Sequence, residues 1–204
     1  MIDLTVFHLG SPLSYLLAFA MPALDAILPI VPSETALVAL GVATAGSTDA
    51  RIALLVAVGA LGAFLGDNLS YLLGHRFGPT VENRLFSSPK GARRRAWAQD
   101  ALRRYGARLI LVCRFVPGGR TAVTLTCGIV SYPRRRFVAA TAVAATIWAC
   151  YAFFIGRLGG QAFEDRPWAG LLAAFVAAAA LSALVEIGRR APRWFRPRRE
   201  PSTQ

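Results

Sequence analysis

The stretch that decides the topology is "LILVCRFVPGGRTAVTLTCGIVSY", residues 109–132, a run of 24 mostly apolar residues interrupted near its middle. Its length alone would allow a single helix to cross a bilayer. Pro117, Gly118 and Gly119 interrupt it, however, and both residue types weaken a continuous helix. The two arms that remain would be about 12 and 18 Å long, well short of the roughly 30 Å hydrocarbon core. We therefore predict a re-entrant helical hairpin over about 109–132.

The composition predicts an integral membrane protein. The chain has 204 residues and is 55% hydrophobic, with a mean hydropathy of +0.46, yet its formal net charge is +12. Apolar and basic blocks must therefore be segregated. Three apolar blocks predict transmembrane helices at about 52–74, 137–156 and 168–187, and only Asp67 is charged within the first block. We expect an all-α protein with one membrane domain over 1–188 and a basic tail over 189–204.

The basic residues predict the orientation in the membrane. Nine lie in residues 75–108, three at 134–136 and six in the tail. The positive-inside rule places such clusters on the cytoplasmic side. If 109–132 crossed the bilayer, the second and third clusters would lie outside, whereas a re-entrant hairpin keeps all three inside. The C-terminus is therefore expected on the cytoplasmic side of the membrane.

Residues 88–107 mix arginines with Trp97, Leu102 and Tyr105, a pattern typical of an amphipathic helix on the membrane surface. We expect this segment and the basic tail to contact anionic lipid. Nucleic acid is not an expected partner, because no recognition motif accompanies the charge.

A second broken stretch, "VPSETALVALG" at residues 31–41, predicts another hairpin over about 22–46, broken at Pro22, Pro29 and Pro32. Like the first, it has Val-Pro, then a charged residue, then Thr-Ala and an apolar arm. The charge is Glu34 here and Arg120 there. The topology has the two hairpins enter from opposite faces, as in the inverted repeats of many transporters.

Three ordered motifs carry a family resemblance: "LDAILPIVPSE" at 24–34, "GDNLSYLLGHRFG" at 66–78 and "CRFVPGGRT" at 113–121, followed by Gly128 and Phe137. In these motifs the chain resembles the DedA family of bacterial membrane proteins, related to the VTT-domain (SNARE-associated Golgi protein) lipid scramblases. The resemblance covers roughly residues 20–160 and implies a multi-pass protein of the bacterial inner membrane. It implies two facing re-entrant hairpins and movement of polyprenyl-phosphate carrier lipid, such as undecaprenyl phosphate, or phospholipid, often tied to the proton gradient.

The resemblance also implies functional acids and arginines, which match here at Asp25, Glu34, Arg114 and Arg120. Asp25 departs from the pattern, because the family has the longer Glu there, which leaves the reach of this carboxylate open. Pro32, Tyr71, Gly74, Pro117, Gly118 and Gly119 belong to the surrounding motifs.

The charges are also informative without the resemblance. A charged side chain at the centre of a span costs on the order of 2.5 to 3.5 kcal/mol, so these residues should face one another or a water-filled cavity. Planar arginine forks suit bidentate contacts with phosphate, which favours Arg114 and Arg120 as phosphate ligands. Glu34, with Asp25 or Asp67, would exchange protons or release the headgroup. The alternative is that these acids and arginines pair only to lock the hairpins together.

The helix around Asp67 has a small residue every fourth position, at Gly62, Gly66, Ser70, Gly74 and Gly78, which predicts close helix packing. Tyr71 lies on the same face as Asp67, either as a packing residue or as its hydrogen-bond partner.

Enzyme motifs are missing from the sequence, and Cys113, Cys127 and Cys150 fit neither a metal site nor a disulfide framework. No metal or cofactor is expected. The predicted function is a lipid transporter; the alternatives are a membrane lipid phosphatase and a non-catalytic assembly factor.

Overall fold

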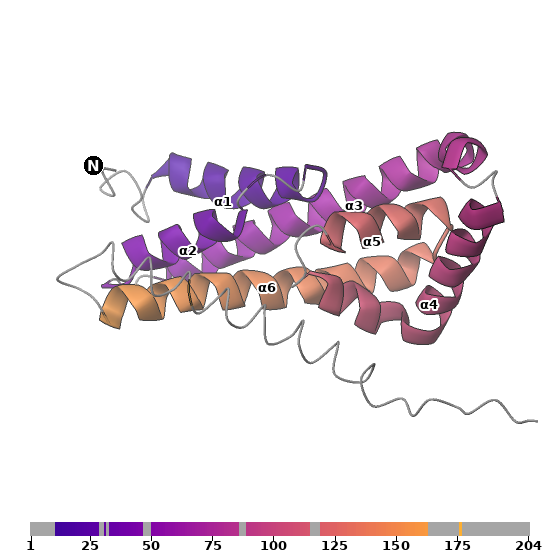
Figure 1. The fold of residues 1–204 in the computed structure, drawn as a ribbon. Coiled ribbons are helices and arrows are strands. Elements are labelled where there is room, and N and C mark those ends of the chain that lie inside the picture. The colour runs from indigo at the N-terminus through magenta and orange to yellow at the C-terminus, as the bar shows by residue number, and fades with distance from the viewer. Residues whose placement is uncertain are drawn as a thin grey trace, which may run out of the picture.

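The structure of this chain is a computed structural model, and it describes residues 11–28, 31, 33–46, 50–85, 89–114, 119–162 and 176. Within these residues the chain forms six helices and no strand (Figure 1), which confirms the all-α class. The helices are α1 (Pro12–Asp25), α2 (Ser33–Ala43), α3 (Arg51–Leu85), α4 (Pro89–Cys113), α5 (Gly119–Ile129) and α6 (Arg134–Ala162).

The two long helices α3 and α6 pack against each other and run the length of the molecule (Figure 1). Each includes a segment long and apolar enough to cross a bilayer, Arg51–Gly78 in α3 and Arg134–Ala162 in α6. These segments contain the spans predicted at 52–74 and 137–156. The third predicted span at 168–187 and the tail at 189–204 lie outside the described residues, apart from the single helical position Val176.

The shorter helices cover the α3 and α6 pair in two groups. α1 and α2 lie at the end where α3 begins, and α4 and α5 lie toward the end where α6 begins (Figure 1). α1 packs on α3 and α2 on α6, while α5 packs on α3 and α4 on α6. Apolar cores form at both ends, one around Val38, Ala149 and Ala152, the other around Cys127 and Phe137.

Small residues set the spacing between α3 and its neighbours. A Cβ atom at Gly74 would overlap the carbonyl oxygen of Leu125 on α5, and one at Gly62 would overlap that of Phe19 on α1. Glycine thus lets the backbones approach closely, as in other membrane helix pairs. The predicted packing role of the small residues on α3 is confirmed at these positions.

The predicted helix break at Pro22 is wrong, because α1 continues through it to Asp25. Proline costs a helix one backbone donor and crowds the preceding turn, but neighbouring helices can compensate. The carbonyl oxygen that loses its intrahelical donor is that of Ala18, one turn earlier. The carbonyl oxygen of the buried Pro22 itself accepts a hydrogen bond from Arg120 Nη2 at 3.1 Å, which joins α1 to α5 at this point. α1 ends at Asp25 and α2 begins at Ser33; Pro29 and Pro32, between them, lie outside the described residues.

The surface segment predicted at 88–107 and the first hairpin arm belong to one element, α4, which runs from Pro89 to Cys113. A sharp kink divides it at Gly106, where φ is +43° and ψ is −121°. This backbone conformation is open to glycine and strained for other residues. The break predicted inside 109–132 lies between Cys113 and Gly119, since α5 begins at Gly119.

Candidate functional site

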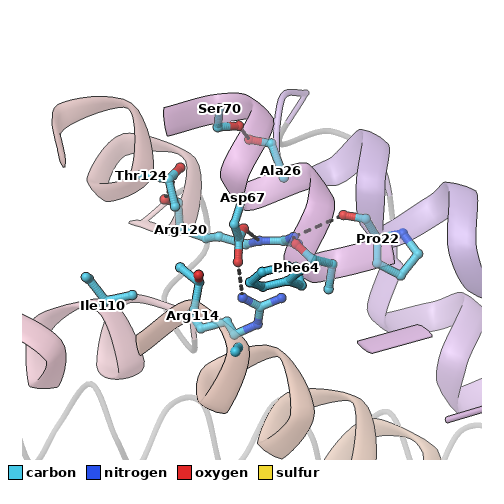
Figure 2. A network of polar contacts seen from close by, with 12 residues as sticks. Pro22, Ala26, Phe64, Asp67, Ser70, Ile110, Arg114, Arg120 and Thr124 are labelled. Carbon is cyan, nitrogen blue, oxygen red and sulfur yellow. Dashed lines mark hydrogen bonds and ion pairs between the residues drawn. The ribbon is translucent and has the colours of Figure 1, made fainter. Parts of the chain in front are cut away.

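A buried carboxylate at the middle of α3 holds two arginines (Figure 2). Asp67 has no exposed surface, and its Oδ2 accepts a hydrogen bond from Arg114 Nη1 at 2.5 Å. Its Oδ1 accepts one from Arg120 Nε at 2.6 Å. The arginines come from opposite sides of the α4 to α5 break, so one acid on α3 fixes both ends of that connection. Such charge-assisted bonds are among the strongest in proteins.

Arg120 ties three helices together from the first turn of α5. Besides Asp67, its guanidinium donates from Nη1 to Asp25 Oδ2 at 3.1 Å, and from Nη2 to the carbonyl oxygens of Pro22 at 3.1 Å and Ala63 at 2.9 Å. Every nitrogen of this guanidinium therefore has a partner. The group is nine-tenths buried, so this complete set of acceptors offsets its desolvation.

Arg114 differs from Arg120 because part of its guanidinium is unused. Its side chain is only 3% exposed, yet Nε and Nη2 have no hydrogen-bond partner within the part of the chain that the structure describes. Its Cζ lies 5.3 Å from the centroid of the Trp148 ring on α6, which holds the plane of the fork by a cation–π contact. Unsatisfied buried donors are costly and rare in native structures, which distinguishes these two nitrogens from those of Arg120.

Asp25, at the end of α1, lies beside the same network. Its Oδ2 accepts bonds from Arg120 Nη1 and from the hydroxyl of Ser33 at 2.8 Å, where α2 begins. Its carbonyl oxygen accepts a longer bond from the Thr121 hydroxyl at 3.4 Å. The end of α1, the beginning of α2 and the beginning of α5 therefore meet beside Asp67. The structure brings four of the five predicted charged residues into one network.

Glu34 is the predicted residue that lies outside this network. Its Oε1 accepts a hydrogen bond from the Tyr151 hydroxyl on α6 at 3.2 Å. No hydrogen bond or ion pair joins it to Arg114 or Arg120 in the described part of the chain. Glu34 directly follows Ser33, which bonds Asp25, so Glu34 lies one residue along α2 from a partner of the network.

Tyr71 lies one helical turn beyond Asp67 but does not bond it. Its hydroxyl donates to the carbonyl oxygen of Tyr132 at 2.7 Å, and its ring centroid lies 4.6 Å from that of Phe137. The alternative of a hydrogen bond to Asp67 is thus wrong, and the packing alternative is confirmed. Among the other motif residues, Gly74 lies in the contact with α5 and Gly119 begins α5, while Pro32, Pro117 and Gly118 lie outside the described residues.

Three neighbours of the charged residues were not identified from the sequence: Ser33, Trp148 and Tyr151. Ser33 gave a weak signal, since it lies between Pro32 and Glu34 in a quoted motif. Trp148 and Tyr151 lie in a continuous apolar block, where an aromatic residue more often serves packing or the membrane interface. Only the packing of α6 against α2 and the end of α4 reveals their contacts.

The fold and the site together define an α-helical membrane protein with a charged network buried between its helices. Comparison with known sequences gives the family: a model described as the VTT domain matches residues 31–158, more than half of the chain. The chain belongs to the VTT-domain family, which confirms the resemblance found in its motifs.

The relatives include Protein DedA of Escherichia coli strain K12, 26% identical over 66% of this chain. The matched region covers 62% of that relative's length. An uncharacterized membrane protein of Mycobacterium tuberculosis is 31% identical over 80% of this chain and 73% of its own length. Undecaprenyl phosphate transporter A of Staphylococcus aureus is 25% identical over 75% of this chain and 77% of its own length. No solved structure matches the chain.

Proposed function

We propose that this protein transports a lipid with a phosphate headgroup across the bacterial inner membrane. The substrate is a polyprenyl phosphate such as undecaprenyl phosphate, or a phospholipid. The observation that carries the proposal is Arg114, whose Nε and Nη2 are buried beside Asp67 and have no partner among the described residues. These two nitrogens lie on one edge of the guanidinium, the geometry with which arginine binds two phosphate oxygens.

In this proposal Arg114 and Arg120 bind the lipid phosphate, and the acids regulate their availability. On Arg114 the phosphate would bind Nε and Nη2, which Asp67 does not use, whereas on Arg120 it would compete with Asp67 and Asp25 for donors already engaged. Protonation of Asp67 or Asp25 would weaken their hold on the arginines and favour the phosphate. Glu34 accepts a hydrogen bond from Tyr151 and directly follows Ser33, which bonds Asp25. From this position Glu34 would exchange protons with the network. Transport would then draw on the proton gradient.

The arrangement in the membrane forms part of the proposal. α2 and α5 have 11 residues each, about 16 Å of helix, which is half of a roughly 30 Å hydrocarbon core. With α1 and the end of α4 they would form re-entrant hairpins that enter from opposite faces and meet at Asp67. Pro32, Pro117 and Gly118 would lie at the hairpin turns, and the two hairpins would be an inverted repeat.

The basic segments would lie on the cytoplasmic side, together with the C-terminus, in contact with anionic lipid. The name of the S. aureus relative, undecaprenyl phosphate transporter A, supports a lipid transporter rather than an enzyme. An identity of 25% is too low to distinguish a polyprenyl phosphate from a phospholipid as the substrate, so the experiment includes both lipids.

The test is lipid exchange in liposomes that contain the purified protein. A labelled undecaprenyl phosphate and a labelled phospholipid are followed between leaflets, with and without a pH gradient. Arg114→Lys keeps the positive charge but removes the fork, Glu34→Gln removes one proton acceptor, and Arg93→Gln changes an exposed arginine on α4 as the matched control. We expect exchange by the parent and by Arg93→Gln. Arg114→Lys should slow exchange about 100-fold or more at any pH, an effect comparable with losing one preorganised charged contact.

Glu34→Gln should reduce the response to the pH gradient more than the exchange rate without one. Parental exchange rates in folded Arg114→Lys and Glu34→Gln would overturn the assignment of these residues. If the folded parent exchanged neither lipid, the proposed transport function would be wrong. Release of inorganic phosphate from the lipid would then indicate a phosphatase, and no reaction at all an assembly factor.

A further inference from the structure

A second cleft lies away from the Asp67 network, between the kink of α4 and the first turns of α6. Its volume is about 860 Å³. The residues that matter for its chemistry are Arg103, Arg104, Leu111, Tyr132, Arg136 and Val143. None of the four residues of the buried charged network lines it. The cleft is thus a separate candidate site.

One side of the cleft is strongly basic. Arg103 and Arg104 precede the α4 kink, and Arg136 lies in the first turn of α6. Arg104 pairs with the exposed Asp100 at 2.8 Å, whereas Arg103 and Arg136 have no ion pair with any residue that the structure describes. Cations in the first turn of a helix also add to the positive end of its dipole. This combination favours an anion.

The other side of the cleft is apolar. Leu111 follows the kink, and Ala139 and Val143 lie in the span Arg134–Ala162. The Val143 side chain is 52% exposed, so this wall is open to whatever surrounds the helix. A ligand that fits both sides has an anionic head and an apolar tail, with the head at the arginines and the tail along α6.

The backbone at Gly106 fixes this shape. The kink turns the basic part of α4 away from its apolar last turns, and a Cβ at Gly106 would lie only 3.2 Å from the Tyr132 hydroxyl. Tyr132 is itself held, because its carbonyl oxygen accepts the hydrogen bond from Tyr71 on α3. The cleft is therefore built by the fold and is not a chance gap between side chains.

We propose that this cleft binds an anionic phospholipid of the surrounding leaflet, with Arg103 and Arg136 on its phosphate and its acyl chain along Leu111, Ala139 and Val143. Charge complementarity selects this occupant over a zwitterionic lipid. The site would hold the interfacial part of α4 at the membrane surface. It is separate from the proposed transport site and does not depend on transport.

The test counts lipids that stay bound to the purified full chain. The protein is mixed in detergent with equal amounts of phosphatidylglycerol and phosphatidylcholine, and retained lipids are identified by native mass spectrometry. The double variant Arg103→Gln, Arg136→Gln removes the two arginines of the cleft that form no ion pair with a described residue. The control Arg93→Gln, Arg135→Gln makes the same change in charge at exposed arginines on the same two helices that do not line the cleft.

We expect the parent and the control to retain phosphatidylglycerol over phosphatidylcholine, and the cleft variant to lose that preference by about tenfold or more. A third variant, Val143→Trp, fills the apolar wall without changing any charge and should lower phosphatidylglycerol retention as well. Equal losses in the two arginine pairs would mean general surface attraction and would overturn the proposal. Unchanged retention in Val143→Trp would equally overturn it, and this variant remains informative if the double variant does not fold.

Discussion

At the scale of single residues, the energetics centre on Asp67. Its fully buried carboxylate forms ion pairs with the guanidinium groups of Arg114 and Arg120, which are themselves nine-tenths buried or more. Burying three charges costs several kcal/mol each, and their mutual bonds, together with the further acceptors of Arg120, offset that cost. Asp25 adds a second negative charge, so the four groups sum to zero formal charge. The stability of the fold should thus depend more on this acid than on any surface ion pair.

Replacing Asp67 by Asn should therefore destabilise the protein strongly. The amide keeps the size of the side chain but leaves Arg114 and Arg120 without full compensation, which costs about 3–5 kcal/mol in buried pairs. The measurement is thermal unfolding of purified protein in detergent. Asp100→Asn is the control, since its pair with Arg104 has side chains that are 56% and 69% exposed and contributes about 0–1 kcal/mol. A smaller loss in Asp67→Asn than in Asp100→Asn would contradict the central role of Asp67.

A second change at this scale tests whether Asp67 and Arg114 act as one unit. In the double variant Asp67→Asn, Arg114→Gln, one buried cation disappears together with the acid. We expect its unfolding temperature to exceed that of Asp67→Asn alone, because residues in direct contact couple by about 0.5–3 kcal/mol. Strictly additive losses would show that the 2.5 Å bond between them contributes little to folding.

The sequence reveals these residues because a charge in an apolar run is conspicuous and expensive. Asp67, Arg114 and Arg120 could be chosen on that ground alone. Their partners are harder to assign: Glu34 bonds Tyr151, which lies 117 positions away, and Tyr71 bonds a backbone carbonyl. Carbonyl acceptors such as those of Pro22 and Ala63 have no sequence signature at all, because every residue carries one.

At the scale of elements, proline and glycine predict the helix break before Gly119 correctly and the break at Pro22 wrongly. The break before Gly119 was predicted, whereas Pro22 stays inside α1, next to the Arg120 guanidinium. The kink at Gly106 was not predicted, because an isolated glycine among arginines gives no more than a weak signal. The small-residue series on α3 was more informative, since its period of four matches one helix face.

The closeness of α3 and α5 gives a prediction at this scale. A Cβ at Gly128 would overlap the carbonyl oxygen of Tyr71, and backbone cannot move aside as a side chain can. Gly128→Ala should thus lower stability by about 1–3 kcal/mol, the usual cost of overpacking. Gly46→Ala is the control, because no atom lies within 4 Å of its Cβ position. The two variants are compared by thermal unfolding, and equal unfolding temperatures would mean that α3 and α5 are less closely packed than described.

At the scale of the whole molecule, the separation of basic and apolar residues was the strongest information in the sequence. It predicted the spans within α3 and α6, which every other described helix packs against directly or through a neighbour. It could not predict that the end of α1, the beginning of α2, the end of α4 and the beginning of α5 meet at Asp67. That meeting depends on contacts between residues up to 98 positions apart, as in the bond from Arg120 to Pro22.

The proposed topology predicts that the two ends of α3 face opposite sides of the membrane. Ala50, just before α3, and Ala96, on the basic part of α4, are both exposed and suit single cysteine substitutions. In intact cells an impermeant maleimide should label Ala50→Cys, whereas Ala96→Cys should react only after permeabilisation, because the positive-inside rule holds the arginines around it in the cytoplasm. The parent chain is the control, since Cys113 and Cys127 are buried and Cys150 is half-buried. Labelling of both variants from the same side would mean that α3 does not cross the bilayer, and the opposed hairpins at Asp67 would then have to be abandoned.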